Sequence, residues 1–267
     1  MTIALAVAAI LVALAAGVRS TWSPCGLSML ATITPLAEQG RGHRYRTTAA
    51  WFVVGSVLGG TTLGLVMALL AVGTAAMDAP TSVLAAIAAA ASVATLAADA
   101  RIGGFTIPIH RRQVNERWLD QFRPWVYGAG FGWQIGTGVA TYIKSCAVYL
   151  MVVLGVLTGS PTIAVVVGVA FGLVRGLAVF WGRRITSTAT LAAFHRRFMA
   201  ADPVALAAVV TCEAAAAVTF SLLVTPWLGG AVAAILSLTA LAWAARRRFR
   251  NAAGIAPTAH PRNVTVP

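Results

Sequence analysis

The chain has 267 residues, of which 59% are hydrophobic and only 10% are charged, and its formal net charge is +13. A soluble domain usually carries about 25% charged residues, so this composition excludes an ordinary soluble fold. Long apolar runs recur from end to end. They predict an all-α polytopic membrane protein with a single transmembrane domain, residues 1–250, and a cytoplasmic tail, residues 251–267.

Seven apolar runs are each long enough to cross a bilayer, which needs roughly 20 residues at 1.5 Å per residue. They lie at about 5–37, 49–72, 81–100, 126–157, 162–181, 203–225 and 227–245. The first and fourth runs exceed the length of a straight crossing, so we expect them to be tilted, broken or partly re-entrant. Pro24 gives the first run a cause for a break, because proline removes a backbone donor and clashes with the preceding turn. The fourth run has glycines instead: Gly128, Gly130, Gly132, Gly136 and Gly138.

The basic residues are concentrated in alternate connectors. All but three of the 20 Lys and Arg residues lie in clusters within 41–46, 101–123, 183–197 and 246–262. The connectors around Asp78, 158–161 and 225–230 carry none. The positive-inside rule then predicts a multi-pass protein of the cytoplasmic membrane with its N-terminus outside and its C-terminus in the cytoplasm. The basic loops are interpreted as topology signals that contact anionic lipid headgroups, not as a nucleic-acid surface.

An internal repeat is suggested by an ungapped offset of 121 residues, which aligns Gly17 with Gly138 and Cys25 with Cys146. Under the predicted topology the first and fourth spans run in opposite directions. We therefore expect spans one to three, about 5–100, and four to six, about 126–225, to form an inverted repeat, with 227–245 outside it. Residue counts place both cysteines near the bilayer centre, where they can meet. Cys212 has no repeat partner and is interpreted as a packing residue.

The first cysteine belongs to the motif Ser23-Pro24-Cys25-Gly26-Leu27 and the second to the pair Ser145-Cys146. These motifs and their separation resemble the CcdA/DsbD family of transmembrane thiol-disulfide reductases, which takes part in cytochrome c biogenesis. The resemblance implies that Cys25 and Cys146 form a reversible intramembrane disulfide without a bound cofactor. It also implies that reducing equivalents enter from cytoplasmic thioredoxin and leave to an extracytoplasmic thioredoxin-like protein. Prolines that the family usually has after the first cysteine and beside the second are absent here.

Three basic residues lie outside the clusters, inside apolar runs: Arg19, Lys144 and Arg175. A charge near the centre of a membrane helix costs at least roughly 2.5 to 3.5 kcal/mol, so such residues usually face a cavity or a partner. Arg19 precedes Cys25 by six residues, and Lys144 precedes Cys146 by two. A cation near a thiol favours the thiolate that attacks in disulfide exchange. For Arg19, snorkelling or a bond to a carbonyl remains an equal alternative.

Arg175 in the fifth span and Glu213 in the sixth lie at similar depths and are expected to form an ion pair between helices. A proton or substrate relay is the alternative interpretation of this embedded carboxylate. Two further functions therefore stay open, a small-solute or ion exporter of inverted-repeat design and a non-catalytic membrane scaffold. The sequence shows no metal-ligand spacing, nucleotide loop or haem motif, so neither a metal nor a cofactor is predicted.

Overall fold

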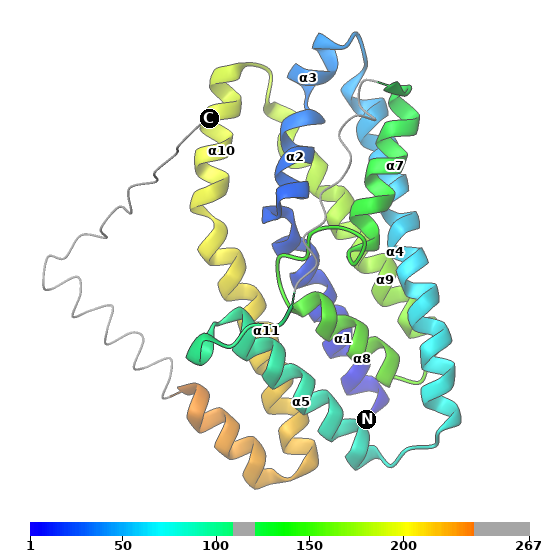
Figure 1. Ribbon diagram of the computed structural model, residues 1–267, viewed down its shortest axis with the longest axis vertical. Helices are drawn as coiled ribbons and strands as arrows, with labels where there is room; N and C mark the ends of the chain where they lie inside the picture. The colour runs from blue at the N-terminus through cyan, green and yellow to red at the C-terminus, as the bar shows by residue number, and fades with distance from the viewer. Residues whose placement is uncertain (109–120, 238–267) are drawn as a thin grey trace, which may run out of the picture.

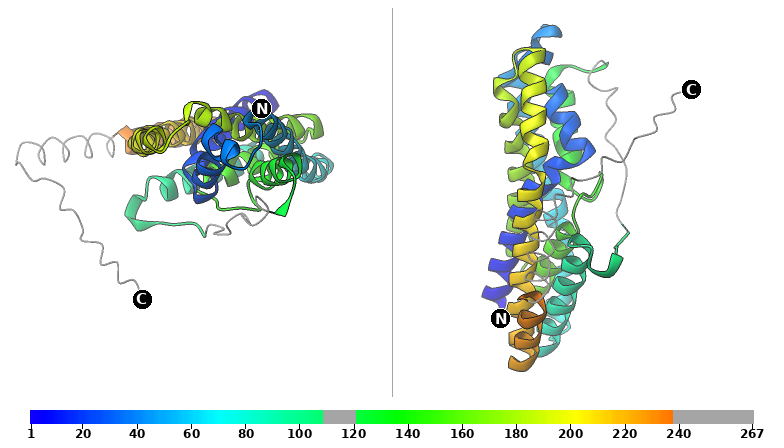
Figure 2. Two further views of the ribbon diagram at one scale, coloured as in Figure 1. Left: turned by 90° about the horizontal axis from the view of Figure 1, so that it is seen from above. Right: turned by 90° about the vertical axis from the view of Figure 1, so that its left-hand side faces the viewer.

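The computed structural model of the chain describes residues 1–108 and 121–237, and within these ranges it contains helices and turns but no strand. Figure 1 shows an elongated bundle whose helices follow one long axis, and the side view in Figure 2 shows the same. Five helical spans in the described part of the chain are long and apolar enough to cross a membrane. The apolar helices therefore fit a membrane protein. The predicted tail at 251–267 and the end of the predicted span 227–245 lie outside the described residues.

The first predicted span is a series of short helices: α1 (Thr2–Arg19), a 3-10 turn (Ser20–Trp22), α2 (Pro24–Thr32) and α3 (Pro35–Gly40). Both α2 and α3 begin with proline, which fits the first turn because its missing N–H is not needed there. Ser23 Oγ accepts the Gly26 N–H at 3.2 Å and so caps α2. Pro24 therefore interrupts the run as expected, and a second proline bends the chain again before α3.

The fourth predicted span is also broken, into α7 (Pro124–Thr137), an irregular segment at 138–146, and α8 (Ala147–Leu157). Gly138 ends α7 with a φ of 70°, a conformation that a residue with a Cβ rarely adopts. The other four glycines of the run lie within the regular helix α7. The expectation that the glycines break this span is thus correct only for Gly138.

The remaining helices follow in chain order: α4 (Tyr45–Ala76), α5 (Thr81–Asp99), a 3-10 turn (Ile102–Gly104), α9 (Pro161–Leu177), a 3-10 helix (Ala178–Arg184), α10 (Thr188–Ala200), α11 (Asp202–Val224) and a short apolar helix (Pro226–Ser237). Helix α10 lies where the sequence indicated a basic loop. A capping box between Ser187 and Thr190 starts it. Together α10 and α11 form a 37-residue apolar span.

Helix α4 packs between α7 and α9 through glycine contacts. A Cβ at Gly136 of α7 would overlap the Ser56 carbonyl of α4, and a Cβ at Gly172 of α9 would lie 2.9 Å from the Gly60 Cα of α4. Ser56 Oγ also donates to the Gly172 carbonyl at 2.7 Å. Small residues at such spacing let membrane helices approach backbone to backbone. The helices α4, α7 and α9 therefore form a closely packed frame.

Two apolar cores lie along the bundle. One contains side chains of α1, α5, α8, α9 and α11 near the end where the N-terminus lies, and the other contains side chains of α2, α7 and α10. Helix α4 contributes to both. Large apolar side chains such as Leu58 and Leu69 of α4 remain on the outside, 56% and 76% exposed. An apolar exterior of this kind suits contact with lipid.

Candidate functional site

Cys25 is the second residue of α2, directly after the break in the helix between α1 and α2, and it is 1% exposed. It packs in the second apolar core with Trp22, Met29 and Phe131. Trp22 stacks on Phe198 of α10 with ring centroids 4.3 Å apart and donates its indole N–H to the Phe198 carbonyl at 2.8 Å. The break before Cys25 is thereby held against the other side of the bundle.

Cys146 is the N-cap residue of α8 and follows the irregular segment 138–146. Its backbone N–H donates to Asp99 Oδ1 at 2.9 Å, and the Ser145 hydroxyl donates to Asp99 Oδ2. Asp99 is the last residue of α5, so a carboxylate from a neighbouring helix caps α8. This places a charged group beside the buried Cys146 side chain, which is 4% exposed.

No disulfide joins Cys25 to Cys146 in this structure. Cys25 and Cys146 nevertheless occupy similar places, each at the N-terminal end of a short helix that follows a break in its span. Cys212 lies on α11 and packs against the first apolar core.

Arg19 lies at the end of α1 and forms an ion pair with Asp202, the first residue of α11. The sequence led us to expect Arg19 beside the Cys25 thiol, at the headgroup level or on a carbonyl. The partner was missed because Asp202 is near in space but 183 positions away in the chain. Arg19 Nε has no hydrogen-bond partner among the described residues.

Arg175 of α9 does not pair with Glu213 within the described part of the chain, which corrects the sequence interpretation. Its guanidinium donates to the Ile135 carbonyl at 3.0 Å and to the Ser20 carbonyl at 3.3 Å. Those carbonyls lie next to the two helix breaks, the one between α1 and α2 and the one between α7 and α8. Backbone acceptors are available to a side chain there. Arg175 thus bridges both breaks, and it is close enough to Cys25 for an electrostatic interaction.

Glu213 of α11 is fully buried, and neither of its carboxyl oxygens has a hydrogen-bond partner among the described residues. Helix α11 packs against α5 there, and Glu213 interacts electrostatically with Asp99 and Cys146. An intramembrane carboxyl group without a cationic partner is costly and often marks a functional position. Glu213 therefore extends the polar region around Cys146 into the bundle.

A cavity of about 800 Å³ lies beside Cys146, lined by residues of α1, α5, α11 and the segments on either side of α7. Its charged lining residues are Arg19, Asp99, Arg101, Lys144 and Asp202. Lys144, which the sequence singled out for its nearness to Cys146, shares this cavity with the thiol. Cys25 does not line it.

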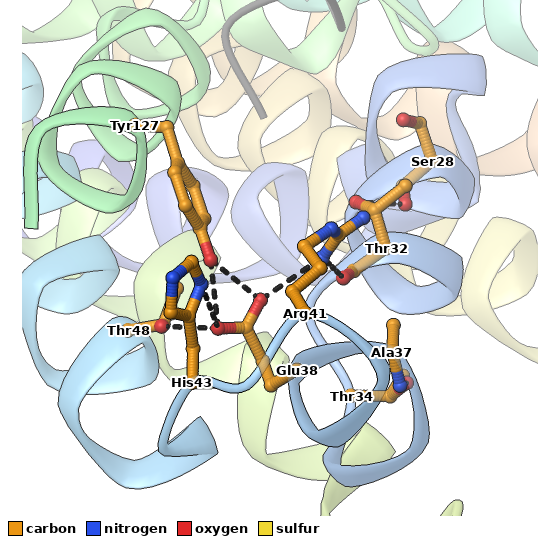
Figure 3. A network of polar contacts seen from close by, with 9 residues as sticks. All are labelled: Ser28, Thr32, Thr34, Ala37, Glu38, Arg41, His43, Thr48 and Tyr127. Carbon is orange, nitrogen blue, oxygen red and sulfur yellow. Dashed lines mark hydrogen bonds and ion pairs between the residues drawn. The ribbon is translucent and has the colours of Figure 1, made fainter. Parts of the chain in front are cut away.

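A second polar network, which the sequence interpretation missed, surrounds the fully buried Glu38 of α3 (Figure 3). Tyr127 of α7 donates to both carboxylate oxygens at 2.7 Å, Thr48 of α4 donates to Oε2 at 2.6 Å, and Arg41 donates to Oε1 at 3.1 Å. His43 Nδ1 lies 4.0 Å from Oε2. The network ties α3, α4 and α7 together at one end of the bundle.

The sequence interpretation singled out only Glu213 among the buried acidic residues, although the scarcity of such residues is a signal that could have identified the others. The chain has only seven Asp and Glu residues, and Glu38, Asp99, Asp202 and Glu213 all take part in the buried polar regions. Within residues 1–108 and 121–237, no group of three or more His, Cys, Asp or Glu side chains is arranged to hold a metal ion.

Comparison with known proteins links the chain to proteins named MauF. It is 29% identical over 174 residues to the methylamine utilization protein MauF of Paracoccus versutus, covering 63% of this chain and 62% of that protein. It is 30% identical over 179 residues to MauF of Methylobacillus flagellatus, covering 64% of this chain and 60% of that protein. The chain therefore spans about three fifths of the length of these curated relatives. No family model matches it, and no solved structure matches it significantly.

Proposed function

We propose that the protein carries reducing equivalents across the cytoplasmic membrane by thiol-disulfide exchange at Cys25 and Cys146. The observation that carries the proposal is that each cysteine lies at the N-terminal end of a short helix, directly after a break in the helical span. Backbone at such a break is free of the constraints of a continuous helix, and transporters often use broken helices near the functional site. A local rearrangement at either break then brings the two sulfurs within disulfide range, a Cα separation of about 4.4 to 6.8 Å.

The proposal includes the topology that the sequence indicates. It has seven spans, an inverted repeat of spans one to three and four to six, an outside N-terminus and a cytoplasmic C-terminus. The alternation of basic and uncharged connectors supports this orientation. The donor is cytoplasmic thioredoxin and the acceptor an extracytoplasmic thioredoxin-like protein, as in the CcdA/DsbD family that the cysteine motifs resemble.

The direct test uses proteoliposomes that contain the purified protein and an enclosed disulfide reporter, with reduced thioredoxin added outside. We expect the reporter to be reduced with the wild-type protein and with Cys212→Ser. Cys25→Ser and Cys146→Ser should each abolish the transfer, because a single thiol cannot release the acceptor from a mixed disulfide. Equal reporter reduction by all four proteins would reject the proposal.

A second candidate is an accessory role in methylamine utilization, which the name of the MauF relatives favours. It is compatible with redox transfer, because an accessory protein can act by maintaining thiols. Deletion of the gene in its host should then prevent growth on methylamine while growth on other substrates continues. Complementation with Cys25→Ser would show whether both roles depend on the same thiol.

A solute or ion exporter is a third candidate, and the unpaired carboxyl group of Glu213 is the observation that favours it. Glu213→Gln should abolish transport if this carboxyl group carries protons or substrate. Under the redox proposal the same variant should retain thioredoxin-dependent reduction of the reporter.

A further inference from the structure

The cavity beside Cys146 has the properties of a small-molecule site. Its volume of about 800 Å³ lies within the range of roughly 300 to 1,000 Å³ that small ligands occupy. Cys146 is its one cysteine among the described lining residues. A molecule inside it therefore reaches the Cys146 sulfur without touching Cys25.

The carboxylates of the cavity have partners within the protein, whereas two of its cationic side chains have no ionic partner among the described residues. Asp202 pairs with Arg19, and Asp99 accepts hydrogen bonds from Ser145 and Cys146. Lys144 and Arg101, in contrast, form no ion pair among the described residues.

The third cation of the cavity also has unused hydrogen-bonding capacity. Arg19 is 5% exposed, and its Nε has no hydrogen-bond partner within the described ranges. A desolvated cation attracts an anion more strongly than an exposed one does. The cavity thus offers cationic groups to an anionic ligand while its own carboxylates are occupied.

We propose that this cavity binds a small carboxylate-bearing thiol, which reduces the disulfide between Cys25 and Cys146. The inference rests on the proposed function and names a low-molecular-weight donor besides thioredoxin. Under the proposed topology the segment 100–108, which lines the cavity, lies on the cytoplasmic side. The donor therefore comes from the cytoplasm.

The exchange balances in two steps. The thiolate of the first molecule attacks Cys146 Sγ, forms a mixed disulfide there and expels Cys25 as a thiolate. A second thiolate then attacks the sulfur of the bound ligand and expels Cys146 as a thiolate. The two ligands leave as one oxidised disulfide, and the two protons that they lost as thiols end on Cys25 and Cys146.

The test measures how fast the oxidised, detergent-purified protein is reduced by three thiols of similar size. They are 3-mercaptopropionate, which is anionic, 2-mercaptoethanol, which is neutral, and cysteamine, which is cationic. Rates are compared per concentration of thiolate and divided by the rate of the same thiolate with a small-molecule disulfide in solution, so that differences in thiol acidity and in intrinsic nucleophilicity both cancel. We expect 3-mercaptopropionate to react about tenfold faster than cysteamine, with 2-mercaptoethanol between them.

Variants identify the source of this preference. Lys144→Met and Arg101→Gln should each reduce the preference for 3-mercaptopropionate over cysteamine to about threefold or less. Because Arg101 is exposed, Arg101→Gln tests the proposal even if Lys144→Met does not fold. Arg46→Gln removes one charge at the exposed start of α4, away from the cavity lining, and should keep the full preference.

The outcomes separate the two proposals. Equal rates for all three thiols, or reduction by thioredoxin alone, would overturn the small-thiol site and leave the redox function standing. Failure of oxidants to join Cys25 to Cys146 would overturn both.

Discussion

The chain is interrupted before Cys25 and again before Cys146, and the two interruptions are stabilised in different ways. The first uses local sequence, with Ser23 capping α2 and Pro24 occupying its first turn. The second depends on Gly138 and on a carboxylate from another helix, Asp99. The first lies in an apolar core and the second beside a charged cavity. Under the proposed redox function, this difference assigns contact with outside molecules to Cys146 and makes Cys25 its partner inside the apolar core.

Among the described residues, Arg175 is the one side chain that binds carbonyls at both interruptions, so its removal should have the largest effect on stability. Arg175→Met loses two hydrogen bonds from a charged donor, and we expect the free energy of unfolding to fall by about 3 to 5 kcal/mol. The free energy of unfolding is measured by reversible unfolding in mixed micelles. Arg184→Met, at an exposed position, should change it by less than about 0.5 kcal/mol. A loss under 1 kcal/mol for Arg175→Met would show that the interruptions do not depend on this bridge.

Gly138→Ala tests the second interruption alone. Alanine is strained at a φ of 70°, and its Cβ would lie 2.9 Å from Phe171 Cζ. We expect a loss of about 2 to 3 kcal/mol in the same assay. Gly73→Ala on α4 is the matched control, because a Cβ there meets no atom within 4 Å and alanine favours a helix. A stable Gly138→Ala protein would mean that the chain can bend here without a positive φ.

Two variants of Asp99 distinguish the hydrogen bonds that cap α8 from the negative charge of the carboxylate. Asp99→Ala removes the acceptor for Ser145 and for the Cys146 N–H and should cost about 2 kcal/mol. Asp99→Asn keeps an acceptor oxygen and should cost about 1 kcal/mol or less. Equal losses for the two variants would assign the stabilisation to charge and not to hydrogen bonding.

Ser23→Ala should have the smallest effect, about 1 kcal/mol, because it removes only the cap of α2 and leaves Pro24 in place. Ser82→Ala, exposed in the first turn of α5, should be neutral. If Ser23→Ala lowered the free energy of unfolding as much as Asp99→Ala does, the two breaks would not differ in how strongly their caps stabilise them.

The sequence predicted those features that depend on neighbours along the chain. The span predicted at 81–100 matches α5 within a residue, and Pro24 correctly indicated a break. The break at Gly138 was less evident, since five glycines looked alike, and the contacts of the helix distinguish the packing positions Gly128, Gly132 and Gly136 from the bend at Gly138.

The polar contacts could not be predicted, because they join residues far apart in sequence. Arg19 and Asp202 are 183 positions apart, and Glu38 and Tyr127 are 89 apart. The expected pairing of Arg175 with Glu213 was wrong because depth alone was considered. Irregular backbone offers carbonyls as an alternative partner for arginine, and the sequence does not show where that backbone lies.

The glycine contacts of α4 divide the molecule into a part that stays fixed and a part that is free to shift. Where backbones touch directly, no side chain can change rotamer to absorb a displacement, so we expect α4, α7 and α9 to keep their relative positions. Cys25 and Cys146 both lie outside these three helices, on α2 and at the start of α8. If the two sulfurs meet as proposed, the motion is expected in these short segments, a change far smaller than the rocking of two halves of a transporter.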